Sequence, residues 1–216
     1  MAITINGTGS ITGLTAGGLP NGSIVADDLA SSLDLTGKTV TLPSGTGGKI
    51  LNVWQGVMKG AQSFAPGSSA PGARSDITNL SITLTPASSS SKFLLTASIC
   101  MGSAGQSPSY HLMCNSTGSF IDIFESTITG GSSNVATWGA HQSGTLGYEY
   151  GTDLQTTSFL HAPAVTSEIT YKVQGQNMYS TGTVYLNQSY RDGSGNDQNY
   201  YNVRSTSSFT VMEISS

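Results

Sequence analysis

Apolar and polar residues alternate with a period of two along much of this chain. The clearest apolar positions are Leu80, Ile82 and Leu84; Phe93, Leu95, Ala97 and Ile99; and Ile169, Tyr171 and Val173. Because successive side chains of a β-strand point to opposite faces, this period predicts strands that each bury one face. We expect these residues to form the core.

Ten strand-like runs follow one another from about residue 50 onward, separated by turns rich in Gly, Pro and Ser. The runs are residues 49–59, 77–86, 92–101, 109–115, 119–127, 134–142, 156–163, 169–177, 182–190 and 204–214. Such spacing, without a helical period between the runs, is typical of an antiparallel sandwich or jelly roll. Residues 49–216 are therefore predicted to be an all-β domain of this kind.

The last run is apolar on both faces. Phe209 and Val211 share one face with Glu213, whereas Met212 and Ile214 share the other. A strand that is apolar on both faces is usually covered on both, and in a two-layer sandwich a neighbouring copy is the simplest second cover. Met212 and Ile214 are thus candidates for a seam between subunits, and Glu213 needs a partner or an edge position.

Residues 1–22 have the alternation of a strand without enough apolar side chains to build a core. Their main apolar residues are Ile3, Ile5, Ile11 and Leu14. These four side chains are too few for a core in one chain, so residues 1–22 need other copies or another protein to bury them.

Residues 23–48 are expected to contain a short helix and a β joint. Ser23 is a suitable N-cap, and an apolar stripe follows at Val25, Leu29 and Leu33. A stripe this narrow suits a seam between identical helices better than a globular core. Val40 and Leu42 then alternate with threonines before a Gly-rich stretch.

The charge content excludes several partners. Only 9% of the residues are charged, the net charge is −4, and eight Lys and Arg are spread thinly. No basic face for nucleic acid can be assembled from them. The chain has no apolar run of 18 residues, so no membrane insertion is expected. Its first residues also lack the basic and apolar regions of a signal peptide, so we expect no secretion signal.

The two cysteines, Cys100 and Cys114, are interpreted as reduced, half-buried thiols in neighbouring strands, because we expect the chain to be made in a reducing compartment. A disulfide between them is the alternative. The three histidines show no ligand spacing with these cysteines, so no zinc site is expected.

Motifs of catalysis are absent or incomplete. The stretch SGTGGKIL lacks the first Gly and the Ser or Thr of a phosphate loop, since Pro43 and Ile50 occupy those positions. Asp122 and Glu125 resemble a glycosidase pair, but residues three apart in a strand face opposite sides. We interpret them as two surface carboxylates. No enzyme activity and no cofactor are predicted.

One loop offers oxygen ligands. The stretch RDGSGND brings Asp192, Asn196 and Asp197 together and could hold calcium weakly. The alternative, which we favour, is a plain Gly-rich hairpin end.

Aromatic residues are the main candidates for recognition. Trp138, His141, Tyr148 and Tyr150 lie within thirteen residues of a Gly-rich stretch. Tyr and Trp rings dominate many interfaces. The interpretation that we favour is packing of Trp138 and one of the tyrosines in the core or between subunits. For the alternative, a loop that contacts a receptor, Tyr148 and Tyr150 are the first candidates and Trp138 the next.

Several stretches resemble small fibre proteins of tailed bacteriophages, of the marine and cyanobacterial phage type. They are ITINGTGSITGLTAGGLPNGSIVADDLA, LTGKTVTLPSGTGGKIL, LTPASSSSKFLL, SFLHAPAVTSEITYKVQ and STSSFTVMEI. The resemblance covers about half the chain and leaves out residues 100–155. It implies a homotrimeric virion protein with a thin shaft and a β-sandwich knob. In such a protein residues 1–22 would be the virion anchor and shaft, with their four apolar side chains repeated around a threefold axis or inserted into another virion protein.

The leading hypothesis is a tail fibre that is anchored in the virion by its N-terminus, where it binds another virion protein. Its knob would contact a glycan or protein of the host surface. A capsid decoration or head fibre with a stabilising or loosely adhesive role is the alternative. A polysaccharide-degrading tailspike is a third hypothesis, disfavoured because the chain has few carboxylates and no β-helix repeat.

Overall fold

A computed structural model describes residues 49–66, 72–102, 106–124, 127, 136–139, 148–178, 182–195 and 202–215. The chain divides between Gly47 and Gly48 into two units, and all the described residues belong to the second. The predicted helix, the shaft and the anchor, with Val25, Leu29, Leu33, Ile3, Ile5, Ile11 and Leu14, lie outside the described residues.

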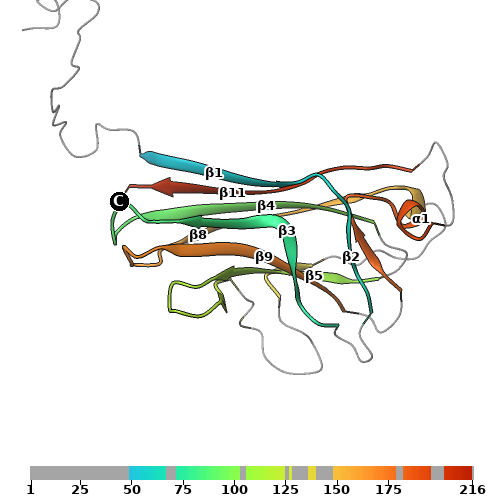
Figure 1. The fold of residues 1–216 in the computed structure, drawn as a ribbon, viewed down its shortest axis with the longest axis horizontal. Helices are drawn as coiled ribbons and strands as arrows, with labels where there is room; N and C mark the ends of the chain where they lie inside the picture. The colour runs from blue at the N-terminus through green and yellow to red at the C-terminus, as the bar shows by residue number, and fades with distance from the viewer. Residues whose placement is uncertain are drawn as a thin grey trace, which may run out of the picture. The chain divides into compact units, whose positions relative to one another are not determined.

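The described unit is built from antiparallel strands, which confirms the all-β prediction (Figure 1). The strands are β1 (Ile50–Met58), β2 (Gln62–Phe64), β3 (Ser75–Leu84), β4 (Lys92–Gly102), β5 (Pro108–Cys114), β6 (Ile121–Asp122), β7 (Trp138–Gly139), β8 (Asp153–His161), β9 (Ile169–Asn177), β10 (Val184–Leu186) and β11 (Ser207–Ile214). Two short helices, the 3-10 helix η2 (Tyr148–Tyr150) and α1 (Tyr190–Gly193), complete the described elements.

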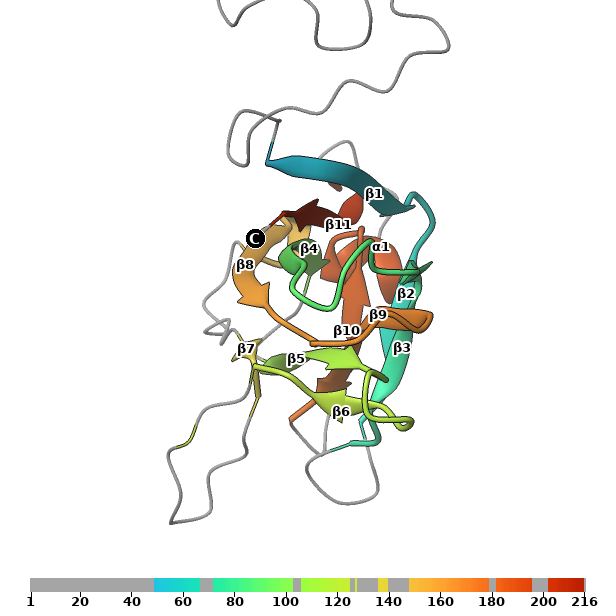
Figure 2. The same cartoon turned by 90° about the vertical axis from the view of Figure 1, so that its left-hand side faces the viewer.

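The strands form two sheets (Figure 2). A six-stranded sheet has the order β1-β11-β4-β10-β2, with β8 paired to the other side of β4. A five-stranded sheet has the order β3-β9-β5-β6, with β7 also paired to β5. No helix among the described residues is long and apolar enough to cross a membrane.

One core cluster draws side chains from both sheets, and the alternation in the sequence predicts it well. All ten apolar residues singled out above are buried, with exposed fractions between 0 and 7%. Strand β4 shows the pattern most clearly, because Phe93, Leu95, Ala97 and Ile99 are each fully buried while Leu94 and Thr96 between them are half-buried.

Glu213 is the carboxylate that the sequence marked as needing a partner, and it has one. It is fully buried beside Phe209 and Val211, and it accepts hydrogen bonds from Asn52 Nδ2 (2.9 Å) and from the Ala87 backbone N–H (2.6 Å). Burial acts to raise the pKa of Glu213, but these bonds outweigh it and hold that pKa below its ordinary value.

The two sheets approach each other closely where β1 crosses β3. A Cβ at Gly56 would lie 2.3 Å from the carbonyl oxygen of Asn79, and Asn79 itself has a positive φ of 62°. Glycine is therefore required at position 56 by the neighbouring backbone.

Three predictions about the fold were wrong in detail. The runs at 119–127 and 134–142 yield only the two-residue strands β6 and β7 in their described parts. Residues 190–193 are helical and are not a plain hairpin end. Cys100 and Cys114 are free thiols, but they lie in β4 and β5 of different sheets, and Cys114 is fully buried.

Candidate functional site

The described unit has two ends of different character. At one end the Ser215 N–H donates to the Lys49 carbonyl oxygen (2.7 Å), so both ends of the described chain meet there. At the other end β4 finishes opposite Asp153, the first residue of β8. Helices η2 and α1 lie at this second end, which we call the distal end (Figure 1).

Helix α1 is short and well capped. The Ser189 side chain accepts a hydrogen bond from the Asp192 N–H (3.3 Å), and the Ser189 carbonyl accepts one from the Gly193 N–H (3.0 Å). Gly193 packs against the ring of Tyr185, where a Cβ would lie 2.3 Å from a ring carbon. This packing sets α1 against β10.

Ionic and aromatic contacts join α1 to η2. Arg191 Nε bonds Glu149 Oε2 at 2.5 Å, and the Arg191 guanidinium lies 5.7 Å from the ring centre of Tyr150. The rings of Tyr185 and Tyr190 meet edge to face at 5.8 Å. We call these five residues, Glu149, Tyr150, Tyr185, Tyr190 and Arg191, the distal cluster.

A second ion pair lies beside the distal cluster. Arg204 donates two hydrogen bonds to the carboxylate of Asp192, at 2.7 and 2.9 Å, and these bonds lower the pKa of Asp192. Asp192, one of the oxygen ligands suggested above for calcium, is thus bound to the Arg204 guanidinium. Asn196 and Asp197 lie outside the described residues.

The distal cluster suits the binding of a polar ligand. Its members are half-buried, so each is packed against the unit and is still partly exposed to solvent. Tyr rings offer apolar faces beside a hydroxyl, and guanidinium and carboxylate groups add hydrogen-bond donors and acceptors. Tyr and Arg side chains of this kind carry much of the binding energy in many protein interfaces.

The aromatic candidates named from the sequence fall in different places. Tyr148 opens η2, Tyr150 belongs to the distal cluster, and His141 lies outside the described residues. Trp138 lies in β7 and packs on Tyr110 at a ring distance of 5.2 Å, against the core. Tyr190 and Arg191 were missed, although Ser189 before an acidic first turn is a helix-start signal.

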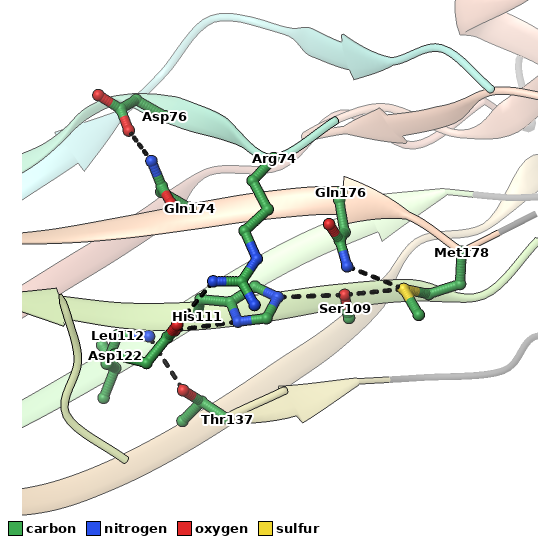
Figure 3. Close-up of polar contacts among 10 residues, drawn as sticks. All are labelled: Arg74, Asp76, Ser109, His111, Leu112, Asp122, Thr137, Gln174, Gln176 and Met178. Atoms are coloured by element: carbon green, nitrogen blue, oxygen red, sulfur yellow. Dashed lines mark hydrogen bonds and ion pairs between the residues drawn. The ribbon is translucent and has the colours of Figure 1, made fainter. Parts of the chain in front are cut away.

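A different polar cluster covers part of the five-stranded sheet (Figure 3). Asp122 accepts a bond from Arg74 Nη1 (2.6 Å) and contacts His111 Nδ1 (3.1 Å), while His111 Nε2 lies 3.4 Å from Ser109 Oγ. Asp122 is only 14% exposed, so the prediction of a surface carboxylate was wrong for it. Glu125 lies outside the described residues.

The order hydroxyl, imidazole, carboxylate in this cluster is that of nucleophilic hydrolases. Here, however, Ser109 is 4% exposed and donates to Met178 Sδ (3.1 Å), and His111 is fully buried. The Ser109 hydroxyl therefore has no surface that a substrate could reach. What the cluster does is tie β6 and the segment before β3 to β5.

His111 is held in its neutral form by its surroundings. Burial lowers the pKa of His111 most, and the charge of Arg74 lowers it further, against the opposing effect of Asp122. Buried in this way, His111 takes up a proton only at a pH below its ordinary range.

No family model matches this chain, and no curated protein matches its sequence.

Proposed function

We propose that this chain is a structural fibre protein of a phage virion and has no enzymatic role. In this proposal three copies assemble through the N-terminal segment, with Val25, Leu29 and Leu33 in a helical seam. Residues 1–22 anchor the fibre to another virion protein through Ile3, Ile5, Ile11 and Leu14. The two sheets of each copy form a β-sandwich knob that faces the host.

The observation that carries this proposal is the polarity of the described unit. Lys49, to which residues 1–48 are joined, lies at one end, whereas Tyr150 and the rest of the distal cluster lie at the other. A knob that is tethered at one end presents its opposite end outward. Loops and helix ends on a rigid β scaffold are also where binding residues are commonly found.

The distal cluster would then contact a host-surface glycan or protein. Interface energy usually concentrates in a few Tyr, Trp and Arg residues, and Tyr150, Tyr190 and Arg191 are of these types. Tyr148 precedes them in η2 and is included in the proposed contact.

Competition for adsorption tests this function. Purified protein is added to host cells before the phage that carries it, and the fraction of phage adsorbed is measured. We expect the wild-type protein to block adsorption and Tyr150→Ala to need at least about tenfold more protein, the effect of losing about 1.4 kcal/mol of binding.

Phe120→Ala is the matched control. Phe120 is 40% exposed and precedes β6, whose Ile121 pairs with Cys114 at the end of the unit opposite to η2. Its removal should leave competition unchanged. If Tyr150→Ala and Phe120→Ala compete as well as the wild type, recognition by the distal cluster is wrong. If the wild type does not compete at all, a capsid decoration becomes the better proposal.

A further inference from the structure

The outer face of the six-stranded sheet carries a continuous apolar row. Leu160 of β8 pairs with Leu94 of β4, Leu94 pairs with Met212 of β11, and Met212 pairs with Val53 of β1. Residues that are directly opposite in antiparallel strands point to the same side of the sheet. The four side chains therefore lie next to one another across four strands, and Leu160 and Val53 are 50 and 56% exposed.

Two hydroxyl-rich rows follow the apolar row along the same face. The first consists of Ser158, Thr96, Thr210 and Gln55, and the second of Thr156, Ser98, Ser208 and Val57. Their side chains bond across the strands, as in Thr96 to Ser158 (3.0 Å) and Gln55 to Thr210 (2.9 Å). These bonds pair several of the hydroxyl and amide groups of the face with one another.

Charge is nearly absent from this face. Among the described outward positions of β1, β11, β4 and β8, Lys92 at one margin is the single charged side chain. Such a face has little to lose when it is removed from water, because no ion must be desolvated. Apolar rows that are exposed on a sheet commonly mark contact surfaces.

The size of the face indicates what covers it. Four strands span about 14 Å, and the six steps from Ser208 to Ile214 span about 20 Å. A single extended segment or one helix with a narrow stripe covers only part of such an area. The same faces of neighbouring copies around one axis are together broad enough, and they offer the same rows of donors and acceptors.

Lys49, where residues 1–48 join the described unit, lies at the margin of this face that is next to the apolar row. Ile50, which follows Lys49, pairs with Ile214, and the apolar row comes next along β11. If three N-terminal segments associate as proposed above, the margins next to Lys49 are drawn toward one axis. Three copies that face this axis would bring three apolar rows together.

We infer that the outer face of the six-stranded sheet, centred on Val53, Met212, Leu94 and Leu160, is the interface between copies of this chain. The inference rests on the proposed trimeric function and names the surface through which the knobs of the three copies would contact one another. Met212 and Ile214, marked as a seam from the sequence, belong to this surface.

The test is a measurement of mass by light scattering over a dilution series of the full chain. The wild type should have three times the 22.3 kDa mass of one chain. The double variant Val53→Asp, Leu160→Asp places two carboxylates in the apolar row. It should dissociate at a protein concentration at least about tenfold higher than the wild type does.

The control places the same two charges elsewhere. Ile121 and Val203 are 44 and 45% exposed and lie outside this face, so Ile121→Asp, Val203→Asp should assemble as the wild type does. Should the aspartate variant of the face fail to fold, Val53→Thr, Leu160→Thr keeps the test open. Thr is a good strand former, and the loss of the apolar row should still weaken assembly.

The outcomes separate this inference from the proposed function. A wild type of one-chain mass overturns the trimer and this interface together. A wild-type trimer with unchanged assembly in both face variants overturns the interface alone, because the N-terminal segments then suffice. Equal weakening by the control variant also overturns it.

Discussion

The outer faces of the two sheets differ in the kinds of polar side chain that they carry. On the six-stranded sheet the outward side chains are hydroxyls, amides and apolar groups arranged in rows. On the five-stranded sheet Lys172 pairs with Asp76 (2.8 Å), Gln174 bonds the same carboxylate (2.7 Å), and Asp122 joins Arg74 to His111. Among the described residues, the first face carries no ion pair, whereas the second carries those of Lys172 with Asp76 and of Arg74 with Asp122.

The few charged side chains of this chain are unevenly distributed over the surface of the described unit. In the described part, ion pairs lie on the five-stranded sheet and at the distal end, in Arg191 with Glu149 and Arg204 with Asp192. A face that is left without ions can be buried at low cost, whereas a face with ion pairs resists burial. The distribution of charge, more than its amount, distinguishes the surfaces.

Removal of the Asp122 carboxylate should have the largest effect on the stability of one chain. Asp122→Ala removes the acceptor of Arg74 and the partner of His111, which is fully buried. We expect a loss of about 2 to 3 kcal/mol, typical for breaking a partly buried ionic and hydrogen-bonded group. Urea unfolding followed by circular dichroism measures it.

Asp76→Ala is the comparison on the same face. The Asp76 side chain is 59% exposed, and its pairs with Lys172 and Gln174 are in contact with solvent. Its removal should cost less than about 1 kcal/mol. Equal losses in Asp76→Ala and Asp122→Ala would show that burial of the Asp122 cluster does not strengthen it.

Acid should weaken the unit through its histidines before its carboxylates act. Burial lowers the pKa of both His111 and His161 below the ordinary 6.5. Below pH 6.5 the unfolded chain therefore binds protons that the folded chain does not, so stability falls as the pH falls. Each histidine contributes up to about 1.4 kcal/mol for each pH unit.

The carboxylates act in a lower window. Asp76, Asp192 and Glu213 have lowered pKa values, so their stabilisation is present above about pH 4.5 and is lost below it. Between pH 5 and 6.5 the change of the free energy of unfolding with pH is therefore expected to come from the histidines.

One substitution on each sheet tests which side chains cause this pH dependence of stability. His111→Gln should reduce the slope of stability against pH between 5 and 6.5, whereas Thr96→Val on the uncharged face should leave the slope as it is. Urea midpoints at several pH values give both slopes. An unchanged slope in His111→Gln would contradict the neutral state of the buried imidazole.

The sequence predicted the fold better than it predicted the sites, for a physical reason. Strand faces follow from a local period of two, so the burial of Phe93 and the need of Glu213 for a partner were both readable. The bonds between Asp122 and Arg74, 48 residues apart, and between Glu149 and Arg191, 42 apart, depend on which strands pair. No local pattern encodes that pairing.

The apolar row illustrates the same limit. Met212 and Ile214 stood out because they share a strand with Phe209 and Val211 on the opposite face. Leu160, Leu94 and Val53 become their neighbours only through the register of four strands that are distant in sequence. The sequence predicted a seam at Met212 and Ile214 alone. The strand register adds the apolar neighbours of Met212 on the outer face of the six-stranded sheet.

The smallest predicted effect is also the sharpest comparison of the two faces. Each face has an exposed hydroxyl pair across two strands, Thr96 with Ser158 (3.0 Å) on the six-stranded sheet and Thr83 with Thr170 (2.8 Å) on the five-stranded sheet. In one isolated copy the two pairs should couple equally, by about 0.2 to 1 kcal/mol. If the six-stranded face is an interface, Thr96 and Ser158 lose contact with water on assembly and their coupling increases. Double-mutant cycles with Val and Ala, measured below and above the dissociation concentration, should therefore differ for the first pair and agree for the second. The same coupling at both concentrations for both pairs would leave the two faces equally exposed to solvent.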